Sequence, residues 1–515
     1  MLLDPVRLEI FNNLYQFIAE QMGIVLQNTA SSVNIKERLD FSCAIFDRHG
    51  LLVANAPHIP VHLGSMSASV SSLINDLKNE IKPGNVYLSN NPYNGGTHLP
   101  DTTVITPVFL DSSSLPVFYV ASRGHQADIG GITPGSMPPH SKHIEEEGIL
   151  FDNLVLVESG NFREDAVRKR LTNSKYPARN PNQNIADFQA QIAANNRGMN
   201  ELLKMVEQYG LETVQAYMQF VQDNAEAAVK DAIAFLQDGE FSCQMDNGAT
   251  IKIKVTIDRQ NLTATIDFTG TSGQLDNNFN APAAVCQAAI LYVFRTLVRD
   301  NIPLNAGCLK PIEVIIPSGC MLNPNYPAAV VAGNVETSQN ITDCLYGALG
   351  IMAASGGTMN NFTFGNDKYQ YYETICGGSG AGKNFDGTDA VQTQMTNSRL
   401  TDPEVLESRF PVIVEEFGIR QHSGGKGIYW GGNGVVRKIV FQEQMTAGIL
   451  SNRRHVLPFG LSGGKAGKKG RNYVVKSDNT VEELDSTATV QMQPGDMFVI
   501  ETPGGGGYGG VERWV

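Results

Sequence analysis

The sequence is poor in charged residues and rich in glycine. Only 18% of its 515 residues are charged, below the roughly 25% typical of soluble domains. The 39 basic and 52 acidic residues give a net charge of −13, which argues against a nucleic-acid binder because such proteins present a basic surface. With 51 glycines and 42% hydrophobic residues, the composition predicts a compact body with tight loops.

Several features of secreted and membrane proteins are also missing. The seven cysteines are scattered and form no Cys-x-x-Cys pair, so we expect neither a disulfide framework nor a structural zinc knot. No stretch of 18 consecutive apolar residues is present, so a membrane-spanning helix is not expected. Residues 1–5 lack the basic segment and apolar run of a secretory signal. These absences predict a protein of the reducing cytoplasm.

The succession of patterns predicts an α+β fold with mixed sheets. The length suggests two or three domains. We expect an N-terminal α+β region with a metal site at 1–180, a helical middle region with a β-hairpin at 181–355, and a β-rich, glycine-rich C-terminal region at 356–515.

Individual elements follow from hydrophobic periodicity and from breaker residues. The first helix should begin at Pro5, because Asp4 is a good N-cap and proline fits the first helical position. Further helices are predicted at 65–81, 184–237 with a break near Gly210, 283–298 and 334–354. Strands are predicted at 102–105, 117–121, 251–257, 262–268, 369–375, 412–416, 435–441, 472–475 and 497–501.

Two histidine–aspartate pairs, each beside a glycine pair, form the sharpest chemical pattern. His98 and Asp101 are three residues apart, and His125 and Asp128 repeat that spacing. Imidazole and carboxylate groups bind divalent transition metals, and open catalytic sites use about three protein ligands. We predict that His98, Asp101 and His125 bind a metal, with Asp128 as an outer-shell partner or fourth ligand. Alternatively, His98 is satisfied inside a loop and Asp101 begins a strand.

A second histidine pair, His58 and His62, lies in the proline-containing segment 57–62. We expect a proline-broken loop here, which does not place both rings on one helix face. Either ring could bind substrate or move a proton near neutral pH. The alternative for each is a histidine satisfied by backbone groups in a rigid turn.

Arginine and glutamate offer weaker candidates. Arginine can clamp a carboxylate with two hydrogen bonds, which makes Arg38 and Arg123 candidates for holding a substrate carboxylate. A pair of Arg38 with the nearby Asp40 explains the first of them equally well. Three glutamates at 145–147 predict a solvated surface, with a metal-facing carboxylate as the alternative.

Residues 377–384 nearly match the phosphate-binding P-loop. That motif needs serine or threonine after its lysine to hold magnesium, and Asn384 is neither. It should also open a helix, which 385–389 do not favour. We therefore predict a glycine loop and no ATP site on this chain.

Long contiguous motifs are shared with a known family and run from about residue 34 to residue 510. They occupy residues 35–43, 55–64, 96–101, 122–139, 397–398, 404–407, 423–425, 431–437 and 502–509. With these motifs the chain resembles the hydantoinase B family, and most closely its 5-oxoprolinase branch.

The resemblance implies a partner and a cofactor. Members of the family work with an A-type subunit that has an actin-like ATP-binding fold, and in some members the two parts are fused in one chain. This chain resembles the B part alone, so ATP would be bound by the partner. In carboxylase relatives a metal sits on a His-x-x-Asp pair and a later histidine, which here match His98, Asp101 and His125. The ion could be Mn, Zn or Fe.

The resemblance also implies an activity. It is the ATP-dependent opening of the 5-oxo-L-proline lactam to L-glutamate, a reaction of glutathione metabolism, after phosphorylation by the A subunit. His58 or His62 would move the proton, and Arg38 or Arg123 would hold the substrate carboxylate. The alternatives are an N-methylhydantoinase, an amidase for another lactam, a ketone carboxylase subunit, or a non-catalytic scaffold for the A subunit.

Two positions depart from the family pattern. Many members carry aspartate where this chain has Asn91, and a second histidine where it has Gln126. Any role of those family residues in acid–base chemistry or binding does not carry over to this chain.

Overall fold

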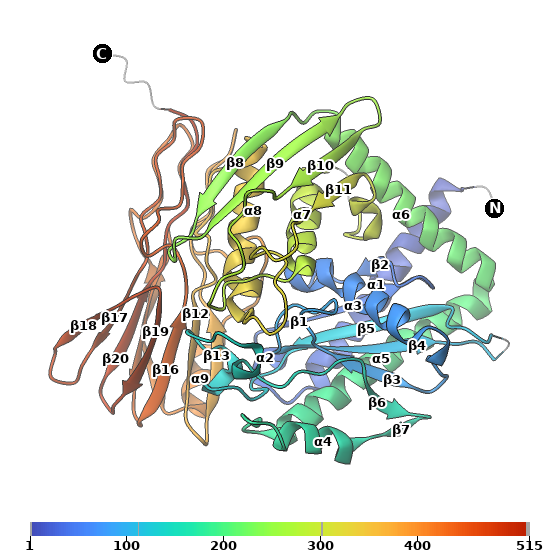
Figure 1. The fold of residues 1–515 in the computed structure, drawn as a ribbon, viewed down its shortest axis with the longest axis horizontal. Coiled ribbons are helices and arrows are strands. Elements are labelled where there is room, and N and C mark those ends of the chain that lie inside the picture. The colour runs from blue at the N-terminus through green and yellow to red at the C-terminus, as the bar shows by residue number, and fades with distance from the viewer. Residues whose placement is uncertain (1–2, 112, 300–301, 511–515) are drawn as a thin grey trace.

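The structure is a computed structural model, which describes residues 3–111, 113–299 and 302–510 (Figure 1). In these residues the fold is mixed α+β, as predicted, with nine α-helices and four sheets. None of the helices in the described ranges is long and apolar enough to cross a membrane. The division into three domains stays a prediction.

The N-terminal part is built around a seven-stranded sheet with the order β2-β1-β5-β4-β3-β6-β7. Its central strands are buried on both faces, because helices cover each side. The strands are β1 (Phe41–Phe46), β2 (Leu52–Asn55), β3 (Val86–Ser89), β4 (Asp101–Val108), β5 (Phe118–His125), β6 (Leu154–Glu158) and β7 (Asn161–Phe162).

Helices α1 (Pro5–Thr29) and α5 (Pro181–Tyr209) pack on one face of this sheet, and α3 (Pro60–Leu77) packs on the other. Helix α1 begins where the sequence predicts, because the Asp4 carboxylate accepts a hydrogen bond from the Val6 N–H at 3.0 Å. The short helices α2 (Val33–Lys36) and α4 (Glu164–Thr172) lie between these elements in the chain.

The middle part pairs helices with a four-stranded sheet of order β11-β10-β9-β8. Their apolar side chains form the largest core cluster of the described residues. The helices are α6 (Leu211–Ile233), α7 (Ala283–Leu297) and α8 (Ser338–Ala348), and the strands are β8 (Gly239–Gln244), β9 (Thr250–Asp258), β10 (Thr263–Asp267) and β11 (Ile312–Ile315).

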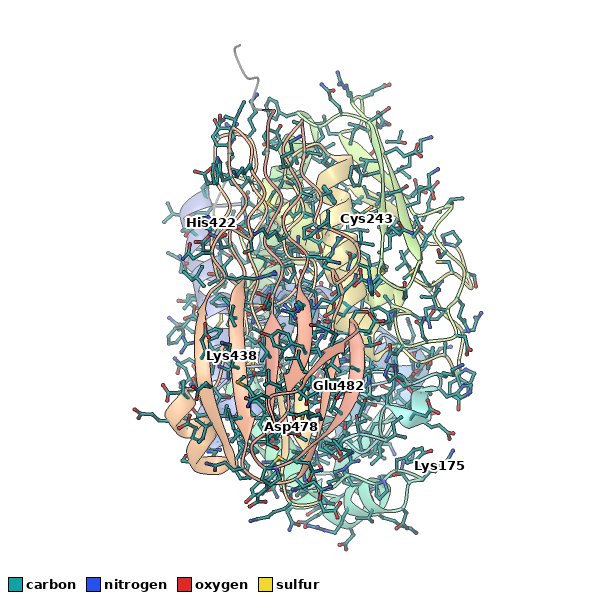
Figure 2. The ribbon with its side chains drawn as sticks, turned by 90° about the vertical axis from the view of Figure 1, so that its left-hand side faces the viewer. Lys175, Cys243, His422, Lys438, Asp478 and Glu482 are labelled. Carbon is teal, nitrogen blue, oxygen red and sulfur yellow. The ribbon has the colours of Figure 1, made fainter. Side chains whose placement is uncertain are left out.

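The C-terminal part contains two sheets, of order β13-β12-β16-β19 and β14-β15-β20-β17-β18. They share one core, in which the rings of Phe362 and Phe498 lie 4.7 Å apart. The outer face of the second sheet carries charged side chains such as Lys438 and Glu482 (Figure 2). The elements are β12 (Asn361–Gly365), β13 (Gln370–Thr374), α9 (Pro403–Arg409), β14 (Val412–Ile419), β15 (Val435–Phe441), β16 (Met445–Leu450), β17 (Arg471–Val475), β18 (Val481–Leu484), β19 (Thr487–Met492) and β20 (Met497–Glu501).

Glycine-rich loops continue beyond these two sheets and run side by side as extended segments (Figures 1 and 2). We call residues 377–388, 423–434, 460–467 and 502–510 the glycine stack. Its backbones hydrogen bond directly, for example Gly505 N–H to Gly432 O at 2.9 Å. A Cβ atom on Gly505 would lie only 1.9 Å from Ser379 O. Glycine is therefore needed here for close approach of backbones.

The predicted helices and strands are confirmed, with differences at their ends. The P-loop-like segment lies in the glycine stack, and no helix follows it at 385–389. The loop expected at 57–62 is confirmed at 57–59 and wrong at 60–62, because Pro60 occupies the first position of α3 and His62 lies in the first helical turn. The helix predicted at 334–354 begins as a π-helical turn, Gly333–Thr337, and ends at Ala348.

Candidate metal centre

The two histidine–aspartate motifs lie at the adjacent ends of two neighbouring strands. Asp101 is the first residue of β4, His125 is the last residue of β5, and the two are register partners in the antiparallel ladder. His98 lies in the tight turn that enters β4, where its carbonyl accepts the Asp101 N–H at 3.1 Å. Strand pairing and one turn thus bring the three predicted ligands together.

The three side chains form a compact, buried group. Asp101 Oδ1 lies 3.1 Å from His98 Nε2 and 3.2 Å from His125 Nδ1. One ligand atom from each residue can be chosen so that all three lie within 4.8 Å of one another. His98 and Asp101 are fully buried and His125 is 2% exposed. This triad could hold a metal ion.

The polar atoms of the triad fit that role. Within the described residues, the buried Nε2 atoms of His98 and His125 make no hydrogen bond of normal geometry, although Asp101 Oδ1 lies 3.1 Å from the first of them, and this is unusual for buried polar groups. The Nδ1 atom of His98 lies 3.3 Å from the Val331 carbonyl, so the tautomer that donates there leaves Nε2 free to act as a ligand. Two imidazoles and one carboxylate suit Mn, Zn or Fe.

The electrostatics favour an ionised Asp101 and a neutral His125. Burial by itself would raise the pKa of the Asp101 carboxyl. The charges of His62 and His98 and hydrogen bonds from His125 and His62 outweigh that effect and hold the pKa well below its usual range. Burial lowers the pKa of His125, against the opposing influence of Asp40 and Asp101. An ionised carboxylate and a neutral imidazole are the forms that bind metal.

His62 belongs to the same cluster, and His58 does not contact it directly. His62 Nε2 lies 3.2 Å from Asp101 Oδ2, and its Nδ1 lies 3.3 Å from Ser42 Oγ. His58 Nδ1 instead accepts the Cys43 N–H at 3.0 Å. Burial, and secondarily the nearby His62, lowers the pKa of His58 to about 3. His58 is therefore neutral and fixed to the backbone.

Arg123 is buried, and its guanidinium joins the sheet to α3. It donates to Thr103 Oγ1 at 2.7 Å, to Ser65 Oγ at 2.6 Å and to Ser69 Oγ at 2.8 Å. The two serines lie on α3, and Thr103 lies on β4. These contacts occupy all three guanidinium nitrogens.

Arg38 is also buried and lies over the ring of Tyr372, which stacks on His125. It donates to the Tyr372 carbonyl at 2.8 Å and lies 3.7 Å from Asp40 Oδ2, so the intramolecular pair named as an alternative is present. The carboxylate of Asp40 in turn lies 4.0 Å from His125 Nδ1. Asp40 is thus a carboxylate beside a candidate ligand, the arrangement typical of an outer shell.

Asp128 and Glu147 differ from the sequence-based expectation. Asp128 pairs with Arg179 at 2.9 Å and accepts from the Gly130 and Gly135 N–H groups, so its carboxylate is held away from the triad. Glu145 is exposed, but Glu147 is fully buried and accepts from the Val330 and Val331 N–H groups. Burial raises the pKa of Glu147 to about 7. A solvated surface at 145–147 is therefore wrong for Glu147, because the turn at Ile144–Glu146 directs it inward.

The two positions that depart from the family pattern have structural contacts. Gln126 donates to Thr102 Oγ1 at 3.1 Å and accepts from Asn184 at 2.9 Å. The Asn91 carbonyl accepts the Gly96 N–H at 2.8 Å, closing the turn that leads to His98.

Two neighbours of the triad were not identified from the sequence. The Tyr372 ring stacks on His125 at 4.6 Å between ring centres, and Asn334 donates to Asp101 Oδ2 at 2.9 Å. Both come from segments more than 200 residues away along the chain. No local pattern could have linked them to the motif.

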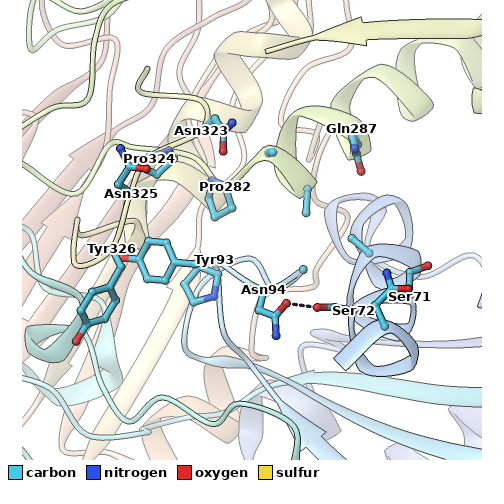
Figure 3. Close-up of a pocket in the computed structure, with 16 residues that line it drawn as sticks. Ser71, Ser72, Tyr93, Asn94, Pro282, Gln287, Asn323, Pro324, Asn325 and Tyr326 are labelled. Atoms are coloured by element: carbon cyan, nitrogen blue, oxygen red, sulfur yellow. Dashed lines mark hydrogen bonds between the residues drawn. The ribbon is translucent and has the colours of Figure 1, made fainter. Parts of the chain in front are cut away.

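A cavity of about 500 Å³ opens beside the loop that leads to His98 (Figure 3). Tyr93 and Asn94 of that loop line it together with Asn325 and Tyr326, and the rings of Tyr93 and Tyr326 lie 5.5 Å apart between centres. The Tyr93 hydroxyl donates to the Ala328 carbonyl and so ties this loop to the segment that continues to Val331. The cavity therefore borders both segments that carry groups of the buried cluster.

Comparison with known proteins identifies relatives along the whole chain. Residues 4–511 match the family described as hydantoinase B/oxoprolinase. The 5-oxoprolinase 1 of Arabidopsis thaliana is 49% identical over 530 residues, covering 98% of this chain and 42% of that protein. The 5-oxoprolinase of Dictyostelium discoideum is 48% identical, covering 100% and 41%. The chain thus spans less than half the length of these relatives.

A solved structure shares the fold. The ATP-dependent caprolactamase from Pseudomonas jessenii superposes with a TM-score of 0.87 at 24% sequence identity, covering 99% of this chain and 92% of that chain. At this identity the likeness shows the fold alone.

Proposed function

The chain belongs to the hydantoinase B/oxoprolinase family, and from that premise we propose that it is the B part of an ATP-dependent 5-oxoprolinase. In this proposal it opens the lactam of 5-oxo-L-proline and yields L-glutamate. The observation that carries the proposal is the buried triad of His98, Asp101 and His125 in a chain 49% identical to the matching part of a 5-oxoprolinase.

The chemistry calls for both a phosphorylating partner and a polar site. A lactam is an amide and a poor electrophile, so phosphorylation of its oxygen on the partner would activate it. A metal held by His98, Asp101 and His125 would polarise an oxygen or activate water. We propose His62 as the proton carrier because its ring lies 3.2 Å from Asp101. His58 is excluded from our proposal because its Nδ1 is held by the Cys43 N–H.

The two arginines, Arg38 and Arg123, have structural roles in the proposal. Each guanidinium is buried and its nitrogens are used by protein groups. We propose that Arg123 braces α3 against the sheet and that Arg38 positions Asp40. The substrate carboxylate would then be held by a group outside the residues predicted from the sequence.

The proposal includes a partner that binds ATP. The relatives that name the activity are more than twice as long as the matched region, and we propose that an A-type subunit with ATP supplies the remainder. An apolar stripe on the solvent side of α1 is surface that such a subunit would cover. It consists of Leu3, Val6, Ile10, Phe17 and Ile24, each at least 46% exposed.

The decisive experiment combines this chain with an A-type subunit, ATP, metal and 5-oxo-L-proline, and measures glutamate. We expect glutamate from the wild type and none from a His98→Ala complex that still assembles. A scaffold without catalytic residues would keep its activity in that variant. A ketone carboxylase would consume bicarbonate and release no glutamate, and a hydantoinase would prefer an N-methylhydantoin.

A further inference from the structure

The segment 330–337 forms one wall of the buried cluster, although it lies far from the motif in the sequence. The Val331 carbonyl faces His98 Nδ1 at 3.3 Å, and the Asn334 amide donates to Asp101 Oδ2 at 2.9 Å. Asn334 is only 2% exposed. Two of the three candidate ligands are therefore contacted by this single segment.

The backbone of the segment is an irregular helix that is fixed from outside. Residues Gly333–Thr337 form a π-helical turn, which inserts an extra residue into the helix entry and is frequent at functional sites. A Cβ atom on Gly333 would lie 1.9 Å from Asn280 O, so only glycine permits this contact. The Thr337 hydroxyl donates to Phe279 O at 2.6 Å. The turn that presents Asn334 thus contacts residues 279–280 at both of its ends.

The two oxygens of Asp101 have different surroundings. Oδ2 accepts from Thr97 Oγ1 at 2.9 Å and from Asn334 at 2.9 Å, and it also faces His62. Oδ1 faces only the two imidazoles of the triad, His98 and His125. The donors on Oδ2 fix the carboxylate so that Oδ1 points to the place where the imidazoles converge.

We propose that Asn334 is a positioning residue, which orients Asp101 so that its Oδ1 atom binds the metal. This inference rests on the proposed function, because it names a residue that supports the proposed metal site. Asn334 acts through Asp101 and does not itself contact the reacting atoms. Its own amide oxygen is buried without a partner, as are Nε2 of His98 and His125. The two unpartnered imidazole nitrogens support a site that is completed by a group outside the protein.

Cobalt(II) titration of the metal-free full chain tests this role without substrate or partner. In Asn334→Leu, a side chain of similar size removes the donor to Asp101. We expect the Kd for cobalt to rise about 10–100-fold, the range typical of losing an outer-shell partner. The visible absorption of bound cobalt should also change, because the carboxylate loses one of the donors that orient it. Asn334→Ser, too short to reach Asp101, is the second variant.

Asn340 provides the matched control. It is also fully buried, lies on α8, and donates to the Glu336 and Gly357 carbonyls instead of to a ligand. Asn340→Leu should lower the thermal unfolding temperature and leave the Kd and the cobalt spectrum unchanged.

The outcomes separate this inference from the proposed function. A wild type that binds cobalt, with folded Asn334→Leu and Asn334→Ser chains that bind it with the same Kd and spectrum, would overturn the positioning role and leave the function intact. Equal losses in Asn340→Leu would also overturn it. Weakened binding in the Asn334 variants, together with absence of glutamate in the reconstituted assay, would support the positioning role and contradict the proposed reaction.

Discussion

Two glycine-rich regions of this chain have similar composition but different structural roles. The loop before β4 uses glycines to make a tight turn that delivers His98 and Asp101 to the end of a strand. The glycine stack looks more like a nucleotide site in sequence, yet its glycines serve to let backbones touch, and Lys383 is exposed. What distinguishes the first region is a neighbouring strand, β5, that brings a third candidate ligand, His125.

The largest effect is expected from removing the carboxylate of Asp101, at the centre of the first region. Asp101→Ala should abolish metal binding and activity, because the carboxylate supplies the charge that faces both imidazoles. The effect on the metal Kd should exceed the roughly 10–100-fold loss of an outer-shell partner. Asp128→Ala is the control, because Asp128 is buried but pairs with Arg179. Metal retained by Asp101→Ala, or lost equally from both variants, would count against the triad.

A methyl group added to the glycine stack tests the other half of the comparison. In Gly505→Ala the new Cβ atom would meet Ser379 O at 1.9 Å, and overpacking of this kind costs about 1–3 kcal/mol. Thermal unfolding should begin earlier, and the metal content of the folded fraction should stay at the wild-type level. Gly356→Ala, whose nearest atoms would lie at 3.5 Å, should change neither quantity. Loss of metal in folded Gly505→Ala would place the stack in the site.

His58 should make the stability of the folded chain depend on pH. The folded pKa of His58 is about 3 against 6.5 for the free side chain, so the unfolded chain binds more protons over that range. The contribution of His58 to the free energy of unfolding is therefore fully present above pH 6.5, and it is lost as the pH falls toward 3. In His58→Asn, urea unfolding of the metal-free chain should show a difference between pH 7 and 5 that is smaller by about 1–2 kcal/mol.

His49, which is exposed, is the control for this measurement. His49→Asn should keep the wild-type difference between the two pH values. An unchanged difference in His58→Asn would mean that His58 titrates normally in the folded chain. His62→Asn should in contrast lose glutamate formation in the reconstituted assay, because its ring contacts Asp101.

The smallest effect is expected at the P-loop-like lysine. Lys383 is exposed, and substitutions of this kind usually change stability by less than about 0.5 kcal/mol. Lys383→Ala should leave both unfolding and the apparent KM for ATP of the reconstituted enzyme unchanged. A clear rise in that KM would mean that the glycine stack contacts the nucleotide.

The sequence predicted those features that depend on neighbours along the chain. Helix α1 followed from its Asp4 cap and Pro5, and the triad followed from two motifs at the ends of adjacent strands. The loop expected at 57–62 does not reach His62, because Pro60 begins α3 instead of breaking a helix, and proline fits the first helical turn. The breaker and starter roles cannot be separated without knowing what the helix packs against.

Local sequence patterns do not reveal contacts between segments that are distant along the chain. Asn334 is 233 residues from Asp101, and Tyr372 reaches His125 from a different sheet. Glu147 looked like one of three solvated carboxylates, and only the fold shows that two backbone N–H groups hold it inside. Such residues are defined by tertiary packing, so the outer part of the site had to come from the structure.

The central claim is that the triad, and not the glycine stack, is the metal-binding centre. The most direct test is elemental analysis of the purified chain beside His98→Ala and Gly505→Ala, with folding checked by circular dichroism. The account predicts a bound transition metal in the wild type and in folded Gly505→Ala, and its loss in folded His98→Ala. Metal that remains in folded His98→Ala, or a wild type free of metal after growth in metal-rich medium, would contradict it.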